Sequence, residues 1–305
     1  MNVPSKPPRQ GAMSLTNWGL LLLLGAIWGG SFFFARIAVA ELHPIALVLL
    51  RVAIAAAALQ IYLAAKGPSF AQALPRAGSF FVLAILNNVI PFSLIFTGQT
   101  ELGAGLAAVL NATTPFWTIL VANQLTRDEK LSWNKVAGIL LGVAGTCVMV
   151  GPGVLAGLGG PVWAKLALIG ASLSYALAAI FSRRFKALPP VLTATGQLTA
   201  STVIMLPVAL LWLGPDRLLP ASEGVWAAVL GLALVSTAIG YSLFFRLIAS
   251  AGATNTSLVT LVVPVSAILL GTVFLGERLE SFELLGMALI ALGLVTIDGR
   301  LLSRR

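Results

Sequence analysis

Long apolar runs separated by short polar segments dominate this chain. Ten of them are found, at about 17–38, 44–65, 77–98, 102–123, 131–151, 163–182, 190–213, 224–248, 252–275 and 283–299. An α-helix needs about 20 apolar residues to cross roughly 30 Å of hydrocarbon. The runs are rich in Leu, Ala and Gly and do not alternate apolar with polar residues, which favours helices over a β-barrel. The pattern therefore predicts an all-α integral membrane protein with ten transmembrane helices.

The composition supports this interpretation. Hydrophobic residues make up 58% of the 305 positions, charged residues only 10%, and the mean hydropathy is +0.98. Soluble domains carry about 25% charged residues, so a water-soluble fold of this size is excluded and the lipid bilayer is the predicted surrounding. The connections between runs are mostly short and leave no room for a soluble domain.

The net charge of +9 is explained by membrane topology rather than by nucleic-acid binding. If the N-terminus is cytoplasmic, most Lys and Arg residues fall on the cytoplasmic side. The exceptions are Arg51 within a span and four residues on the opposite side, Arg36, Lys165, Arg217 and Arg278. This asymmetry follows the positive-inside rule. It predicts that both termini are cytoplasmic.

The chain contains an internal repeat. IPFSLIF at residues 90–96 returns as IGYSLFF at 239–245, a shift of 149, and Trp28 aligns with Tyr175 at a shift of 147. Each copy holds five predicted helices, and because five is odd, the second copy must enter the membrane from the opposite side. We therefore expect two inverted five-helix repeats. The expected division is an N-terminal tail 1–16, a first repeat 17–151, a linker 152–162, a second repeat 163–299 and a C-terminal tail 300–305.

Several passages resemble the EamA-type branch of the drug/metabolite transporter superfamily. They are WGGSFFFAR in the first predicted helix, HPIALVLLR entering the second, LNATTPFWTILVANQLTRDEK in the fourth, and NTSLVTLVVPVSAILLGTVFLGERL in the ninth. Within that family the chain is most similar to bacterial exporters of aromatic amino acids of the YddG type. The resemblance implies a ten-helix bundle in the bacterial inner membrane, with a substrate cavity lined by the first, third, fourth, sixth, eighth and ninth helices.

Polar and aromatic side chains gather on those same helices. Polar groups in hydrocarbon are costly and tend to face the bundle interior, and aromatic faces suit flat or cationic groups. The alternatives for the aromatic residues are lipid-facing anchors and core packing. The predicted substrate-cavity residues are Trp28, Ser31, Asn87, Asn88, Asn111, Thr114, Ser174, Tyr175, Thr237, Tyr241 and Thr260.

The prolines predicted to kink helices are Pro91, Pro115 and Pro264. Proline lacks a backbone N–H and disturbs the carbonyl four residues earlier. For Pro115 and Pro264 these carbonyls belong to Asn111 and Thr260, so we expect kinked helices beside the cavity. The alternative is that proline is simply tolerated, with Ser, Thr or water satisfying the carbonyl.

Arg51 is the only charged residue well inside a span, and its repeat partner is the neutral Gln197. A central arginine costs about 2.5–3.5 kcal/mol on insertion scales. It could bind a substrate carboxylate. Because the resemblance puts the second helix outside the cavity, we favour a structural tie to neighbouring carbonyls.

No chemistry-bearing cluster is found. The Asp and Glu residues fall in predicted loops or at helix ends, the only histidine is His43 in a loop, and the only cysteine is Cys147. No catalytic residue, metal site or cofactor is predicted, and no intramembrane proton relay is evident.

These features predict a secondary transporter of amino acids, aromatic or other small amphipathic metabolites, working by alternating access as an exporter or facilitated exchanger. The alternatives are a proton-coupled multidrug or metabolite exporter, an integral-membrane enzyme and a passive channel. The partners expected are a small-molecule substrate and the bilayer, without nucleic acid. A monomer is expected to function, with a dimer as the alternative.

Overall fold

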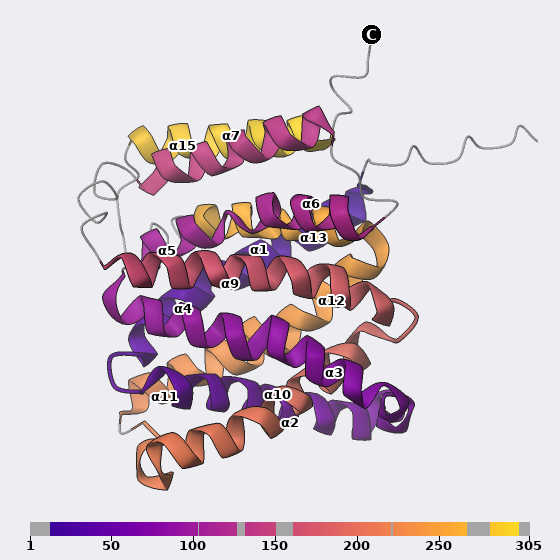
Figure 1. Cartoon of the computed structure of the whole chain (residues 1–305), viewed down its shortest axis with the longest axis vertical. Helices are drawn as coiled ribbons and strands as arrows, with labels where there is room; N and C mark the ends of the chain where they lie inside the picture. Colours follow the sequence, from indigo (N-terminus) through magenta and orange to yellow (C-terminus); the bar gives the residue numbers. More distant parts are fainter. Residues whose placement is uncertain are drawn as a thin grey trace, which may run out of the picture.

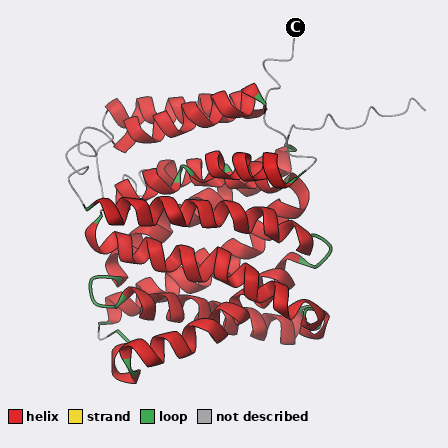
Figure 2. Cartoon of the chain, in the orientation of Figure 1, coloured by secondary structure: helices red, strands yellow, loops and turns green. Residues whose placement is uncertain are grey.

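The computed structural model describes residues 13–102, 104–126, 132–150, 161–220, 222–266 and 281–298. Every regular element in these residues is a helix (Figure 2). The predicted C-terminal tail 300–305 lies outside the described residues, as do most of the N-terminal tail 1–16 and of the linker 152–162.

The first half of the chain contains the elements α1 to α7. Their bounds are α1 Leu15–Ala38, α2 Pro44–Lys66, the 3₁₀ turns η1 Phe70–Gln72 and η2 Leu74–Arg76, α3 Ala77–Ala84, the π-helical η3 Ile85–Val89, α4 Ile90–Glu101, α5 Ala104–Asn111, α6 Thr114–Leu125 and α7 Trp133–Val150. The Ser14 hydroxyl caps α1, and the His43 Nδ1 atom accepts from the Ile45 N–H at the start of α2.

The second half repeats the same kinds of element. Their bounds are α9 Val162–Ser182, the 3₁₀ turn η4 Arg183–Phe185, α10 Pro190–Leu213, the 3₁₀ turn η5 Pro215–Arg217, α11 Glu223–Leu230, the π-helical η6 Gly231–Ile239, α12 Gly240–Ala251, α13 Ala253–Ser257, a helical stretch 259–266, and α15 Ser281–Asp298. Proline opens both α2 and α10, where its missing N–H has no intrahelical partner to lose.

Six helical segments of the described chain are long and apolar enough to cross a membrane: Leu15–Ala38, Pro44–Lys66, Phe70–Glu101, Val162–Phe185, Pro190–Leu213 and Glu223–Ala251. They coincide with six of the ten predicted spans. The other four, predicted at 102–123, 131–151, 252–275 and 283–299, are occupied by shorter helices or continue into residues outside the described part.

The predicted span 102–123 is interrupted beside Pro115, where a kink was predicted. α5 ends at Asn111, and Pro115 lies in the first turn of α6, where a proline breaks no hydrogen bond within α6 itself. The carbonyl that loses its donor is that of Asn111, and the Thr114 hydroxyl donates to it at 2.6 Å. Thr114 therefore satisfies the carbonyl that Pro115 leaves without a donor, as the alternative interpretation expected.

The ninth predicted span is also interrupted. The helix is broken at Leu258, between α13 and the helical stretch 259–266 that contains Pro264. Thr260 does not leave its hydroxyl unpaired, because it donates to the Ser257 carbonyl at 2.9 Å. The interruption lies a turn and a half before the proline, not at it.

α7 and α15 lie side by side at one end of the molecule (Figure 1). A Cβ atom at Gly138 would lie 2.5 Å from the Gly293 carbonyl oxygen, and one at Gly145 would lie 2.7 Å from that of Gly286. Real Cβ atoms do not approach so closely, so the absence of a Cβ at Gly138, Gly145 and Gly293 lets the two backbones touch.

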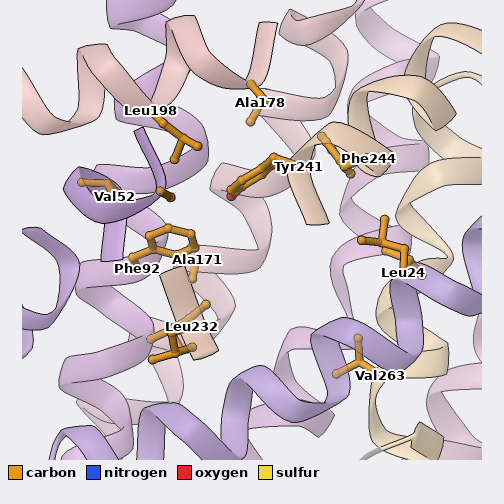
Figure 3. Packing of buried hydrophobic residues seen from close by; sticks show 14 of the residues in the cluster. Leu24, Val52, Phe92, Ala171, Ala178, Leu198, Leu232, Tyr241, Phe244 and Val263 are labelled. Carbon is orange, nitrogen blue, oxygen red and sulfur yellow. The ribbon is translucent and has the colours of Figure 1, made fainter. Parts of the chain in front are cut away.

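Buried apolar side chains fill the space between the remaining helices. Figure 3 shows part of this core, in which Leu24 of α1, Phe92 of α4, and Tyr241 and Phe244 of α12 are buried between the helices. The cavity described below lies within this packed region.

Candidate functional site

One cavity in the described part of the chain combines aromatic, polar and charged lining. It holds about 750 Å³ of space free of protein atoms, part of which is open to the outside. Nine residues predicted from the sequence line it: Trp28, Ser31, Arg51, Asn87, Asn111, Thr114, Tyr175, Tyr241 and Thr260. The other lining residues were not predicted from the sequence: Phe32, Ala35, Phe92, Ile95, Phe96, Gln99, Ala179, Phe244, Ser257, Val259 and Val263.

Three predicted cavity residues do not line it. Asn88, Ser174 and Thr237 are buried behind the lining, and each makes a hydrogen bond there. A polar residue in a span can satisfy a neighbouring helix as well as face a cavity, and spacing alone cannot distinguish the two.

Aromatic rings form one wall. The ring centroids of Trp28 and Tyr241 are 6.0 Å apart in an edge-to-face arrangement, and Phe244 lies 5.6 Å from Trp28 and 5.9 Å from Tyr241. Edge-to-face pairs at such distances add about 0.5–1.5 kcal/mol each beyond burial. The wall therefore joins α1 of the first half to α12 of the second and offers an apolar, rigid face.

The π-helical η3 carries Asn87 into the lining, and Pro91 explains its hydrogen bonds. In η3 the Ile90 N–H donates to the Ile85 carbonyl, so the next π bond would run from residue 91 to the Leu86 carbonyl. Proline has no N–H to give. The Ser174 hydroxyl donates to the Leu86 carbonyl instead, at 2.7 Å.

Pro91 also removes the α-helical donor to the Asn87 carbonyl. The Tyr241 hydroxyl donates to this carbonyl at 3.0 Å and accepts from the Asn88 amide nitrogen at 3.1 Å. Tyr241 and Asn88 were both expected to face a substrate. Tyr241 lines the cavity and also ties α12 to η3, whereas Asn88 does not line it and also accepts from the Ser201 hydroxyl of α10 at 3.1 Å.

The longer π-helical segment η6 is supported from the first half. The Trp28 indole N–H donates to the Ser236 carbonyl at 2.9 Å, while the Gly240 N–H donates to Val235 and Thr237 rather than to Ser236. A Cβ atom at Gly240 would lie 2.6 Å from the Trp28 indole nitrogen. Glycine is therefore what permits this approach of α1 to η6.

Arg51 lies on α2 and reaches the cavity with only 5% of its surface exposed. Its Nε–H donates to the Thr237 hydroxyl at 2.7 Å, and its guanidinium carbon lies 3.9 Å from the Phe92 ring centroid. A desolvated cation–π contact contributes about 2 kcal/mol, whereas burying a charge without a counter-ion costs several kcal/mol. The carbonyl tie expected for Arg51 is not what holds it, and α2 contributes to the lining, unlike the second helix that the resemblance implies.

Two buried amide oxygens of the lining have no hydrogen-bond partner in the described chain, Gln99 Oε1 and Asn111 Oδ1. Their residues are 0% and 6% exposed. An unmade buried hydrogen bond costs about 1–3 kcal/mol, so these acceptors suit a ligand that brings N–H or O–H donors.

Helical spacing could have found part of what the sequence analysis missed. Phe92, Phe96 and Gln99 follow Asn88 at intervals of four, four and three residues and so share one face of a helix. The hydroxyl-bearing neighbours Ser93 and Thr97 are more polar, but they do not line the cavity.

No group of three or more His, Cys, Asp or Glu residues close enough to hold a metal ion occurs in the described residues. The cavity lining contains none of these residue types. The arrangement can bind and shape a small molecule, but it offers no acid–base pair for covalent chemistry.

Comparison with known proteins agrees with this geometry. A sequence model of the EamA-like transporter family matches residues 17–151 and 162–297. The uncharacterized inner membrane transporter YedA of Escherichia coli K12 is 27% identical over 281 residues, which cover 92% of this chain and 90% of YedA. A probable terminal-alkyne amino-acid exporter of Streptantibioticus cattleyicolor is 26% identical over 302 residues, covering 96% of both chains.

A solved crystal structure shares the fold. It aligns with a TM-score of 0.76 at 21% sequence identity, covering 96% of this chain and 99% of the other.

Proposed function

The chain belongs to the EamA-like transporter family, and on that premise we propose that it carries amino acids or similar small amphipathic metabolites across the bacterial inner membrane. It is a membrane transporter rather than an enzyme. The proposed mechanism is alternating access, in which the protein works as an exporter or a facilitated exchanger.

The cavity is the observation that carries this proposal. Its lining comes from both halves of the chain, with Trp28, Arg51 and Asn111 from the first and Tyr175 and Tyr241 from the second. A site at the interface of two repeats can open to either side when the repeats exchange their conformations.

Reciprocal glycine contacts support inverted repeats. In the sequence, Gly138 and Gly145 align with Gly286 and Gly293 at a shift of 148. The contacts pair Gly138 with Gly293 and Gly145 with Gly286. A two-fold axis turns each of these contacts into the other, as in any self-complementary interface. With five helices in each repeat, such an axis lies in the membrane plane. Ten helices then place both termini on the same side, which we propose is the cytoplasm. The proposed working unit is a monomer.

Amino acids are the substrate class that the lining suits best. A face of aromatic rings packs against an apolar side chain, and the two unpartnered amide oxygens of Gln99 and Asn111 accept from an ammonium group. The Streptantibioticus relative, which is named a probable amino-acid exporter, supports the same class.

We expect the protein to work by facilitated exchange rather than by coupling transport to the proton gradient. No Asp, Glu or His lines the described cavity, so a carboxylate relay of the kind that drives proton exchange has no evident member there. Counterflow that persists after an uncoupler collapses the proton gradient would support exchange. Loss of concentrative transport with the uncoupler would favour the proton-coupled alternative.

The test is counterflow by the purified full-length protein in liposomes, screened across the standard amino acids. We expect at least one to exchange well above protein-free liposomes. The variant Asn111→Leu, which keeps the branched shape but removes the unpartnered oxygen, should lose most of this activity. Asn134→Leu, at an exposed asparagine of α7, is the matched control and should retain it. Counterflow of no amino acid would refute the proposed substrate class.

A further inference from the structure

We propose that Arg51 binds the carboxylate of the transported molecule and so restricts this transporter to amphipathic carboxylates. This inference rests on the proposed function and assigns the recognition of the substrate's acidic group to one residue. Phe92 and Thr237 are its positioning residues.

The chain contains its own comparison for Arg51. Gln197 occupies the equivalent position in the second half, at a shift of 146, and is 0% exposed on α10. Its Oε1 atom accepts from the Asn87 amide at 2.9 Å in η3, much as Arg51 bonds to Thr237 in η6. A neutral glutamine therefore ties its helix to a π-helical segment without any charge. The positive charge of the Arg51 guanidinium is therefore not required for this structural contact.

Most of the donors of Arg51 remain available. Arginine carries five N–H groups in a planar fork, and the described chain accepts only the Nε–H, through the Thr237 hydroxyl. No Asp or Glu lines the cavity in the described residues. Among the described residues, the four terminal N–H groups thus have no hydrogen-bond acceptor and the charge has no carboxylate counter-ion, and a bidentate carboxylate supplies both.

Neighbouring side chains fix the orientation of the Arg51 guanidinium. The Thr237 hydroxyl is itself fixed, because it donates to the Leu232 carbonyl at 2.6 Å while accepting from Arg51. The guanidinium lies over Phe92, at 3.9 Å from the ring centroid, with Phe96 at 5.7 Å. The same rings line the cavity. A ligand with its carboxylate on Arg51 therefore places its adjoining apolar part against aromatic surface.

A single carboxylate fits better than a phosphate monoester. Arg51 is the only charged side chain in the cavity lining of the described residues. One guanidinium neutralises one negative charge, and a phosphate near two charges would remain undercompensated in a low-dielectric site.

The test measures binding separately from transport. Purified full-length protein in lipid nanodiscs is screened by thermal stabilisation with the standard amino acids, and the strongest stabiliser is then compared with its own carboxamide. We expect the acid to bind at least tenfold more tightly than the carboxamide, which keeps the same side chain and ammonium group. Equal binding of the two, or stabilisation by none of the amino acids, overturns the proposal.

Variants of single arginines test whether Arg51 causes the preference for the acid over the carboxamide. Arg51→Gln, which copies the second half, should lower the affinity for the acid at least tenfold and leave that for the carboxamide nearly unchanged. Arg184→Gln is the matched control, because it removes an exposed arginine that also lies over a ring, 3.6 Å from the Phe181 centroid. Its acid-to-amide ratio should equal that of the wild type. An unchanged ratio in Arg51→Gln contradicts the assignment.

Thr237 acts through Arg51, so its variants require a finer readout. Thr237→Val should reduce the preference for the acid over the carboxamide, and Thr237→Ser, which restores the hydroxyl, should recover it. If Arg51→Gln does not fold, Arg51→Lys keeps the charge without the fork and should retain only part of the preference. The wild-type comparison of acid with carboxamide stands without any variant.

Failure of this inference and failure of the proposed function give different results. A protein that binds the acid over the carboxamide but does not transport it supports the role of Arg51 and refutes transport of that ligand. A protein that exchanges amino acids and their carboxamides equally well supports transport and refutes the role of Arg51.

Discussion

The two helices that carry the repeated passage contain π-helical segments at matching places. η3 ends directly before IPFSLIF in the first half, and η6 ends at the first residue of IGYSLFF in the second. A π segment leaves backbone carbonyls without their usual donors. In both helices the replacement donor comes from the opposite half, with Ser174 and Tyr241 serving η3 and Trp28 serving η6.

The residues beside the two π-helical segments differ between the halves. Pro91 removes a donor in the first helix, whereas the equivalent Gly240 makes room for the indole of Trp28 in the second. The neighbouring helices differ as well, since a neutral Gln197 meets η3 and a charged Arg51 meets η6. The backbone irregularity is therefore shared by the two halves, and the chemistry beside it is not.

The largest effect is expected from Gly240→Ala. The added Cβ atom would lie 2.6 Å from the Trp28 indole nitrogen and would separate it from the Ser236 carbonyl. Overpacking together with a broken buried hydrogen bond should cost about 2–3 kcal/mol of unfolding free energy. The measurement is denaturation by SDS in mixed micelles.

Gly224→Ala in α11 is the control for this change, because nothing lies within 4 Å of a Cβ atom built there. It should match or exceed the wild type in stability, since alanine favours a helix more than glycine does. Equal stabilities of the two variants would show that the contact of Trp28 with η6 does not matter.

A smaller effect is expected from Tyr241→Phe, which gives the second helix the residue that the first has at Phe92. The change removes the hydroxyl that donates to the Asn87 carbonyl and accepts from the Asn88 amide. We expect a loss of about 1–2 kcal/mol in the same assay, because hydrogen bonds in membrane proteins contribute modestly. Tyr62→Phe, at a half-exposed tyrosine of α2, should change stability little. A loss no greater than that control would contradict the bridging role of Tyr241.

The smallest effect is expected from removing the Ser174 hydroxyl, which donates to the Leu86 carbonyl of η3. Ser174→Ala should cost about 1 kcal/mol, because the Leu86 carbonyl loses its donor. In a Pro91→Ala background the cost should fall, since residue 91 then supplies an N–H to the same region. A double-mutant cycle on unfolding free energy measures this coupling.

Ser182→Ala is the matched control for that cycle. Its hydroxyl donates to the Ala179 carbonyl of its own helix, far in sequence from η3. Its cost should be the same with and without Pro91→Ala. A cycle for Ser174 that closes to zero would mean that Pro91 is not the reason for the contact.

Much of the fold could be predicted from the sequence. Long apolar runs require helices in a bilayer because unpaired backbone groups are costly there, so the positions of α1, α2, α9 and α10 followed directly. The candidate site followed in part, because costly polar groups such as Asn87 and Asn111 had to point inward.

Other features depended on partners distant in the sequence. The break at Asn111 and the π geometry around Asn87 depend on which backbone carbonyls find hydrogen-bond donors on neighbouring side chains. Hydrophobic periodicity does not reveal these neighbours. Asn88 and Thr237 were expected in the cavity, yet each bonds to another helix instead. A polar residue has the same preference for the interior in either case, and only packing decides which neighbour it meets.

The sequence by itself determined that the chain crosses the membrane repeatedly, that its two halves are related, and that one arginine lies within the apolar region. Hydrophobicity and periodicity are properties of single segments, so each of these could be read locally. Only the tertiary structure decided that Arg51 would reach a cavity, lie over Phe92 and bond to Thr237, 186 positions away. Such contacts depend on how helices from both halves pack, and packing is a property of the whole chain.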